Sequence, residues 1–153
     1  MNDVKIENGL INGVQLISVN GYDDQTGSLS VLISQGREDA PDAEKIGEIY
    51  LVSVNEAKSV RGKHKHVLLD EFFIIIDGSA EFFLIDDREN SLTKDKKESF
   101  ILNSKDMKAL FVPCGVYHAF VTLEDNTRCL AISNNSYDRN KPDTYPIPFS
   151  SFK

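Results

Sequence analysis

The apolar residues of this chain occur in short blocks separated by turn-forming residues, and this pattern constrains the fold more than any other feature. The blocks are rich in β-branched and aromatic residues, recur at a spacing of roughly ten residues, and rarely show helical periodicity. The pattern predicts an all-β protein whose antiparallel strands form a sandwich or barrel. Strands are expected at residues 13–19, 29–33, 46–54, 65–69, 71–76, 80–85, 99–102, 109–112, 118–123 and 128–133.

Turn signals lie between these blocks. Asp77-Gly78-Ser79 separates two runs rich in Phe and Ile and predicts a β-hairpin, because an Asp-Gly pair tolerates positive φ. Prolines make the tail from residue 141 onward extended rather than helical. Further turns are expected at residues 20–27, 86–91 and 123–126, and a polar loop at 35–43.

Length and composition are those of an ordinary globular protein. The 153 residues are expected to form one domain, 1–153, and 41% hydrophobic with 27% charged residues is not the composition of a disordered or coiled-coil chain. The longest strongly apolar run, 72–76, is too short to span a membrane. No secretory signal is recognised, and two cysteines are too few for a disulfide scaffold, so a cytoplasmic location is expected. The net charge of −7 argues against nucleic acid or an anionic membrane as the main partner but allows a small anionic ligand in a local basic pocket.

The three histidines are the most informative residues. His64 and His66 are two positions apart, which on a strand places both imidazoles on one face. Glu71 follows them, and a Pro-Gly turn precedes His118. A single histidine on a strand is usually an ordinary core or surface residue, but all three histidines in this arrangement indicate a functional site.

These residues form the patterns HxHx4Ex6G and PxGxxH, which resemble the two signature motifs of the cupin superfamily. The resemblance implies a double-stranded β-helix, which is a small antiparallel jelly-roll barrel that directs the motif side chains into its interior. His64, His66, Glu71 and His118 would then surround one point. This barrel hosts many unrelated functions, so the fold does not identify the chemistry.

Two chemistries are open at that point. In one, the four residues bind a divalent metal ion such as Mn, Fe, Ni or Zn, as in many cupins. In the other, the protein uses no metal or other cofactor, because a histidine in a half-buried pocket has a suitable pKa for acid–base catalysis. The motif spacing does not separate these alternatives.

Residues that flank the histidines favour the second alternative. The run RGKHKH at 61–66 resembles the RGxHxH signature of the nucleotide-sugar cupins, which include dTDP-4-dehydrorhamnose 3,5-epimerases and dTDP-4-keto-6-deoxyhexose 3,4-ketoisomerases. The resemblance implies an isomerase of deoxysugar, polysaccharide and lipopolysaccharide biosynthesis. Its substrate would be a nucleoside-diphosphate 4-keto-6-deoxyhexose, with dTDP as the expected nucleotide, and it would remove a proton next to the ketone. Similar segments follow in the same order at residues 24–29, 86–91, 111–120, 135–138 and 142–143.

The resemblance also implies roles for single residues. His64 matches the catalytic base, His66 completes the histidine pair, and Tyr137 in the late segment is a third catalytic candidate. Arg61 matches a residue expected to bind phosphate, which suits the fork of donors on a guanidinium. The alternatives are an ordinary surface arginine and a packed tyrosine at the barrel rim. Further substrate-binding residues are expected to be His118, Glu71, Tyr50 and Arg88.

Two positions depart from the epimerase pattern. Glu71 stands where the epimerases carry a lysine, and Ala131 stands where they carry a proton-donating tyrosine. A carboxylate cannot stabilise an enolate as a cation does, and Glu71 also completes the metal-binding quartet. The protein is therefore expected to use another acid, to catalyse a related step, or to bind sugar nucleotides without turnover. Candidates for the acid are Tyr50, Tyr117 and Tyr137.

Four phenylalanines suggest an oligomer. Phe72, Phe73, Phe82 and Phe83 alternate between the two faces of the predicted hairpin, so one member of each pair should be core. The other two need a cover from a second sheet or a second subunit, and we therefore expect a homodimer. The alternative is that one chain covers both faces.

Overall fold

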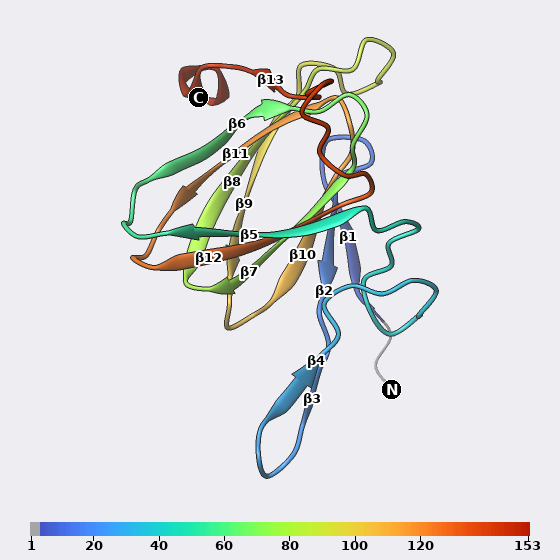
Figure 1. The fold of residues 1–153 in the computed structure, drawn as a ribbon, viewed down its shortest axis with the longest axis vertical. Helices are drawn as coiled ribbons and strands as arrows, with labels where there is room; N and C mark the ends of the chain where they lie inside the picture. Colours follow the sequence, from blue (N-terminus) through green and yellow to red (C-terminus); the bar gives the residue numbers. More distant parts are fainter. Residues whose placement is uncertain (1–3) are drawn as a thin grey trace.

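The computed structural model describes residues 4–153, and these residues form two antiparallel sheets that face each other (Figure 1). Almost all regular structure is strand, as predicted. The six-stranded sheet contains, in spatial order, β1 (Ile6–Asn8), β2 (Gln15–Ser18), β10 (Lys108–Val112), β7 (Glu71–Asp77), β12 (Thr127–Ser133) and β5 (Glu48–Val54). The five-stranded sheet contains β13 (Tyr145–Pro146), β6 (Val60–Lys65), β11 (Val116–Thr122), β8 (Ser79–Asp86) and β9 (Lys97–Asn103).

Two further elements lie outside the sheets. A separate hairpin of β3 (Gly21–Asp23) and β4 (Ser28–Ser30) projects from one end of the molecule (Figure 1). The chain ends in a single 3-10 turn, η1 (Phe149–Phe152). Within residues 4–153, no helix has the length and hydrophobicity needed to cross a membrane. Residues 1–3 of the predicted domain lie outside the described residues.

The core lies between the two sheets because the strands alternate buried and half-buried residues. On β8 every second side chain is buried, as the period of a strand requires. Phe73 from β7 packs against Phe82 from β8, with ring centroids 5.5 Å apart. Burying a phenylalanine contributes roughly 1.5–3 kcal/mol relative to leaving it exposed, so this contact helps to hold the sheets together.

The predicted hairpin at Asp77-Gly78-Ser79 is wrong. The turn is present, and Gly78 has a φ of 77°, but β7 pairs with β10 and β12 whereas β8 pairs with β9 and β11. The segment is a corner between the two sheets. The chain turns from one sheet to the other because both Phe73 and Phe82 face the shared core. An Asp-Gly turn permits either connection.

Other differences concern the ends of elements. The predicted strand at 65–69 is wrong, because β6 ends at Lys65 and residues 66–69 form a loop. The predicted turn at 20–27 contains β3. The tail is extended as far as Pro148 but then forms η1, which the prolines did not predict.

The outer phenylalanines are covered by their own chain. Phe72 belongs to a second apolar cluster, outside the six-stranded sheet, that includes Ala43 from the polar loop. Phe83 packs against Phe149 of η1, with ring centroids 5.6 Å apart. The argument from uncovered phenylalanines to a dimer is therefore wrong, and the homodimer needs other support.

Candidate active site

The three imidazoles meet between the sheets. His64 on β6 pairs with His118 on β11, and His66 directly follows β6. Ring centroids are 4.8 Å apart for His64 and His66, 4.8 Å for His64 and His118, and 5.6 Å for His66 and His118. The predicted convergence is confirmed, while the catalytic roles of the three residues remain predictions.

A β-bulge in β6 determines which side of the strand its side chains point to. Gly62 and Lys63 both have positive φ, 81° and 64°. Gly62 pairs with Ala119 and His64 pairs with His118, so Lys63 is the extra residue of the bulge. Arg61 pairs with Phe120 and His64 pairs with His118, so both face the same side although they are three residues apart. A Cβ at position 62 would lie 3.0 Å from the carbonyl oxygen of His118, so glycine is needed there.

Glu71 joins the imidazoles from the opposite sheet. It is the first residue of β7 and is 2% exposed. Its Oε1 lies 2.6 Å from His66 Nε2 and 3.9 Å from His118 Nε2, while the Tyr50 hydroxyl donates to Oε2 at 2.7 Å. Oε1 is buried and, although in ion-pair contact with His66, receives no hydrogen bond of good geometry from the described residues.

The ionisation of this cluster follows from burial and contact. Burial acts to raise the pKa of Glu71, but the close contact of His66 Nε2 with Oε1 and the charges of both neighbouring histidines lower it to about 2. Burial acts to lower the pKa of His66, but the close contact with Glu71 and the attraction of its charge raise it overall. Burial, followed by repulsion from His66, lowers the pKa of His64, and burial lowers that of His118 to about 4. The arrangement favours a protonated His66 beside a neutral His64.

Tyr50 is a hydrogen-bond donor in this cluster. Part of its ring is exposed, but its hydroxyl lies against Glu71. Burial, the charge of Glu71 and the hydrogen bond to it all raise the Tyr50 pKa, so the phenol stays neutral. Tyr50 thus lies beside the imidazole cluster with its hydroxyl proton donated to Glu71, and its roles in substrate binding and as the acid stay predictions.

The remaining predicted residues differ in their exposure and in their neighbours. Arg61 is exposed and, within residues 4–153, has no hydrogen-bond or ion-pair partner, so its guanidinium is available for an anion. Tyr137 is 59% exposed and lines a cleft of about 350 Å³ that also includes His66. Tyr117 carries the ammonium of Lys65 over its ring, 5.0 Å from the centroid.

Arg88 is not brought to the imidazoles. Its guanidinium binds the buried carboxylate of Asp86 through two hydrogen bonds, from Nε at 2.8 Å and from Nη2 at 3.0 Å. It also donates to the carbonyl oxygen of Asn12. The predicted role of Arg88 in substrate binding gains no support from this geometry, which fits a structural ion pair.

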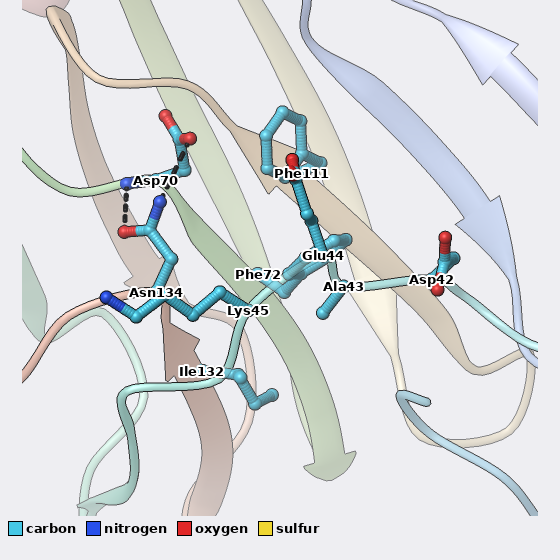
Figure 2. Close-up of a pocket in the computed structure, with 9 residues that line it drawn as sticks. All are labelled: Asp42, Ala43, Glu44, Lys45, Asp70, Phe72, Phe111, Ile132 and Asn134. Atoms are coloured by element: carbon cyan, nitrogen blue, oxygen red, sulfur yellow. Dashed lines mark hydrogen bonds between the residues drawn. The ribbon is translucent and has the colours of Figure 1, made fainter. Parts of the chain in front are cut away.

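A larger cavity lies on the other side of the six-stranded sheet. It measures about 570 Å³, and its apolar floor of Phe72, Phe111 and Ile132 lies beside Asp70 and Asn134, which hydrogen-bond to each other (Figure 2). Phe72 and Glu71 are adjacent on β7 and point to opposite faces. None of the predicted site residues lines this cavity, so its size does not make it the candidate active site.

Sequence reasoning gave no individual role to Asp143. Its carboxylate accepts hydrogen bonds from the backbone N–H groups of Val67 and Leu68, at 2.9 Å and 2.8 Å. Its carbonyl oxygen bonds to His66 Nδ1. The only signal was its place in the late segment 142–143 of the family resemblance, because the contact with His66 spans 77 positions.

The family of the chain follows from comparison with known proteins. The family described as FdtA, WxcM-like, C-terminal matches residues 12–146. The chain belongs to this family. The resemblance to nucleotide-sugar cupins is thereby confirmed, and the cupin fold with it.

Individual relatives agree with this assignment. The spore coat polysaccharide biosynthesis protein SpsL of Bacillus subtilis is 26% identical over 141 residues, which are 92% of this chain and 91% of the relative. The probable low-salt glycan biosynthesis epimerase Agl13 of Haloferax volcanii is 26% identical over 120 residues, 77% of each chain. The crystal structure of dTDP-4-dehydrorhamnose 3,5-epimerase from Bacillus anthracis, with TDP and PPi bound, has a TM-score of 0.82 and covers 95% of this chain and 85% of its own. At 18% identity, that last likeness shows a shared fold alone.

The imidazole cluster also fits a metal ion. One ligand atom from each of His64, His66 and His118 lies within 4.8 Å of the others. Glu71 is not part of this set, although its Oε1 contacts His66 Nε2 at 2.6 Å and lies 3.9 Å from His118 Nε2. Imidazole and carboxylate are suitable ligands for divalent transition metals. Such an ion would supply Lewis-acid stabilisation of a developing oxyanion.

Proposed function

We propose that this protein is an isomerase that acts on a nucleoside-diphosphate 4-keto-6-deoxyhexose, with dTDP as the nucleotide, and needs no metal. The observation that carries the proposal is a pair of adjacent imidazoles inside the barrel, with the pKa of His64 lowered and that of His66 raised. Membership of the WxcM-like family and the polysaccharide and epimerase names of its relatives support the same activity.

The two histidines supply both halves of a proton transfer. Neutral His64 removes a proton from the carbon next to the ketone, and the electron pair of that C–H bond moves into an enolate. His66 then returns a proton. It goes either to the other face of the same carbon or, once the hydroxyl on that carbon has passed its proton to the enolate oxygen, to the former carbonyl carbon. The first outcome inverts a stereocentre and the second moves the carbonyl.

Protonated His66 also compensates for the missing lysine. Glu71 occupies the position of that lysine but contacts His66 and favours its positive charge. A fixed positive charge near a developing enolate oxygen stabilises it. Arg61, on the same side of β6 as His64, is suited to hold the diphosphate.

Deuterium exchange tests the proposal. Incubation with dTDP-4-keto-6-deoxyglucose in deuterated buffer should place deuterium on a carbon next to the original or the new carbonyl, as read by NMR and mass spectrometry. Protein treated with a chelator should retain this activity. A lack of incorporation across several nucleotide sugars, with tight dTDP binding, would instead identify a non-catalytic sugar-nucleotide-binding protein.

A metal-dependent enzyme is the second candidate. Three imidazole ligand atoms within 4.8 Å of one another favour it, because divalent transition metals bind imidazole. Elemental analysis of purified protein separates the two candidates. One tightly held metal ion for each chain, with activity lost in chelator, would favour the metal enzyme.

We further propose that the protein is a cytoplasmic homodimer that supplies a deoxysugar for a surface polysaccharide such as lipopolysaccharide. The support for the dimer is exposed apolar surface on two features of the fold. Edge strand β5 exposes Ile49 and Leu51, and the β3–β4 hairpin exposes Tyr22 and Leu29. Contact with a second copy would bury these side chains.

A charge on the hairpin should dissociate this dimer. The unmodified chain is expected at twice its mass of 17.2 kDa in light scattering after gel filtration, and Leu29→Asp is expected to be a monomer. Leu92→Asp is the matched control, because Leu92 is 97% exposed in the loop between β8 and β9. A monomeric unmodified chain would contradict the proposed dimer.

A further inference from the structure

The segment that carries His66 is held from the far end of the chain. Residues 66–69 form a loop, and the tail beyond residue 141 runs alongside it. Tyr145 and Pro146 of β13 pair with Lys65 and His64 of β6. The tail is therefore a direct neighbour of both histidines of the pair.

Asp143 makes the closest contacts within this tail. Each of its two carboxylate oxygens accepts one backbone N–H, from Val67 and from Leu68. Both of these residues are exposed, so water could satisfy their N–H groups equally well. The carboxylate is therefore not required to satisfy buried groups. What it does is fix the direction of the backbone that follows His66.

The carbonyl group of Asp143 fixes the ring itself. A carbonyl oxygen only accepts, so His66 Nδ1 must carry a hydrogen and donate it to Asp143. The other ring nitrogen, Nε2, lies 2.6 Å from Glu71 Oε1. The imidazole is thus held at both nitrogens, by the tail on one side and by β7 on the other.

We propose that Asp143 is a positioning residue, which holds the His66 ring in the orientation needed for proton transfer. The kinetic part of this inference rests on the proposed isomerase function. The residue does not touch the imidazole of His64 and acts only through His66. Because a misplacement of about 1 Å in an active site can cost about 10²-fold in rate, removal of the Asp143 carboxylate is expected to lower kcat by up to about that factor.

The test compares Asp143→Ala with two other variants. Asp143→Asn keeps one oxygen acceptor and should recover part of the lost kcat. Asp125→Ala is the matched control. The Asp125 carboxylate also accepts a hydrogen bond from a loop N–H, that of Ala57, but Asp125 lies in the turn between β11 and β12. We expect Asp143→Ala to lower kcat with little change in KM, and Asp125→Ala to leave both unchanged.

Histidine resonances give a readout that a general loss of stability would not move. In protein labelled with ¹⁵N-histidine, His66 should show an Nδ1–H proton that exchanges slowly with water, and Asp143→Ala should lose it by fast exchange. Asp125→Ala should retain it. An unchanged kcat and an intact resonance in folded Asp143→Ala would overturn the proposal. Should that variant not fold, the same two measurements on Asp143→Asn decide, with wild-type values overturning it.

The two proposals can fail separately. If the unmodified protein turns over no nucleotide sugar, the proposed function fails, yet the Nδ1–H resonance still reports whether Asp143 orients His66. If the unmodified protein is active but Asp143→Ala is equally active, only the positioning role fails.

Discussion

Replacement of His64 by asparagine is expected to lower kcat on the 4-keto sugar by about 10²–10⁴-fold, the range typical for loss of a positioned general base. His64 combines a lowered pKa with a half-buried position, so its neutral imidazole can accept a proton from a substrate. His118 is too deeply buried to take over this role. Asparagine is close in size to histidine and should preserve the bulge in β6.

Binding and fold serve as controls for this variant. Its circular dichroism spectrum, thermal midpoint and dTDP affinity should match those of the unmodified protein, because none of them depends on proton abstraction. The metal alternative makes a different forecast: His64→Asn, His66→Asn and His118→Asn would each release a bound ion. Wild-type kcat in His64→Asn would remove His64 from the mechanism.

Truncation of Glu71 to alanine is expected to destabilise the protein by about 3–5 kcal/mol, the cost of breaking a buried ion pair by removing one partner. The truncation leaves the Tyr50 hydroxyl and His66 Nε2 without their partner in a closed site. Urea unfolding followed by circular dichroism at pH 5.5, with chelator present, measures the difference. Glu71→Gln is the matched control, because the amide retains an acceptor for Tyr50 and removes only the carboxylate charge.

The pH dependence separates the charge of Glu71 from its shape. Folding lowers the pKa of Glu71 from an ordinary 4.5 to about 2, which corresponds to about 3 kcal/mol. This stabilisation is fully present above about pH 4.5 and is lost as the pH falls toward 2. The unmodified protein should therefore lose its stability advantage over Glu71→Gln across that range. An equal advantage at pH 5.5 and pH 2.5 would mean that the carboxylate charge contributes nothing.

The strands and the shared face of His64 and His66 were predictable from the sequence because both depend on local periodicity. Blocks of β-branched residues indicate strands wherever they occur, and two histidines two positions apart must share a face of one strand. The position of His118 beside this pair could be predicted only from the family resemblance, because β6 and β11 are far apart in the sequence. Their pairing belongs to the topology of the barrel.

The wrong predictions concern features that are determined by tertiary contacts and not by the local sequence. An Asp-Gly turn is compatible with a hairpin and with a corner, and only the packing of Phe73 against Phe82 selects the corner. Arg88 was assigned to substrate binding, but its guanidinium forms an ion pair with the buried carboxylate of Asp86. The contacts of Asp143 depend on a tail that returns to β6, and no local pattern encodes such a return.

The bulge at Gly62 and Lys63 means that the main chain sets how far the proposed phosphate anchor lies from the proposed base. Arg61 and His64 flank the distortion, and both lie on the same side of β6 only because an extra residue is accommodated between them. Side chains elsewhere in the barrel can therefore change without altering this spacing. Members of such a family could diverge in where the proton returns to the sugar while still accepting a substrate of the same length.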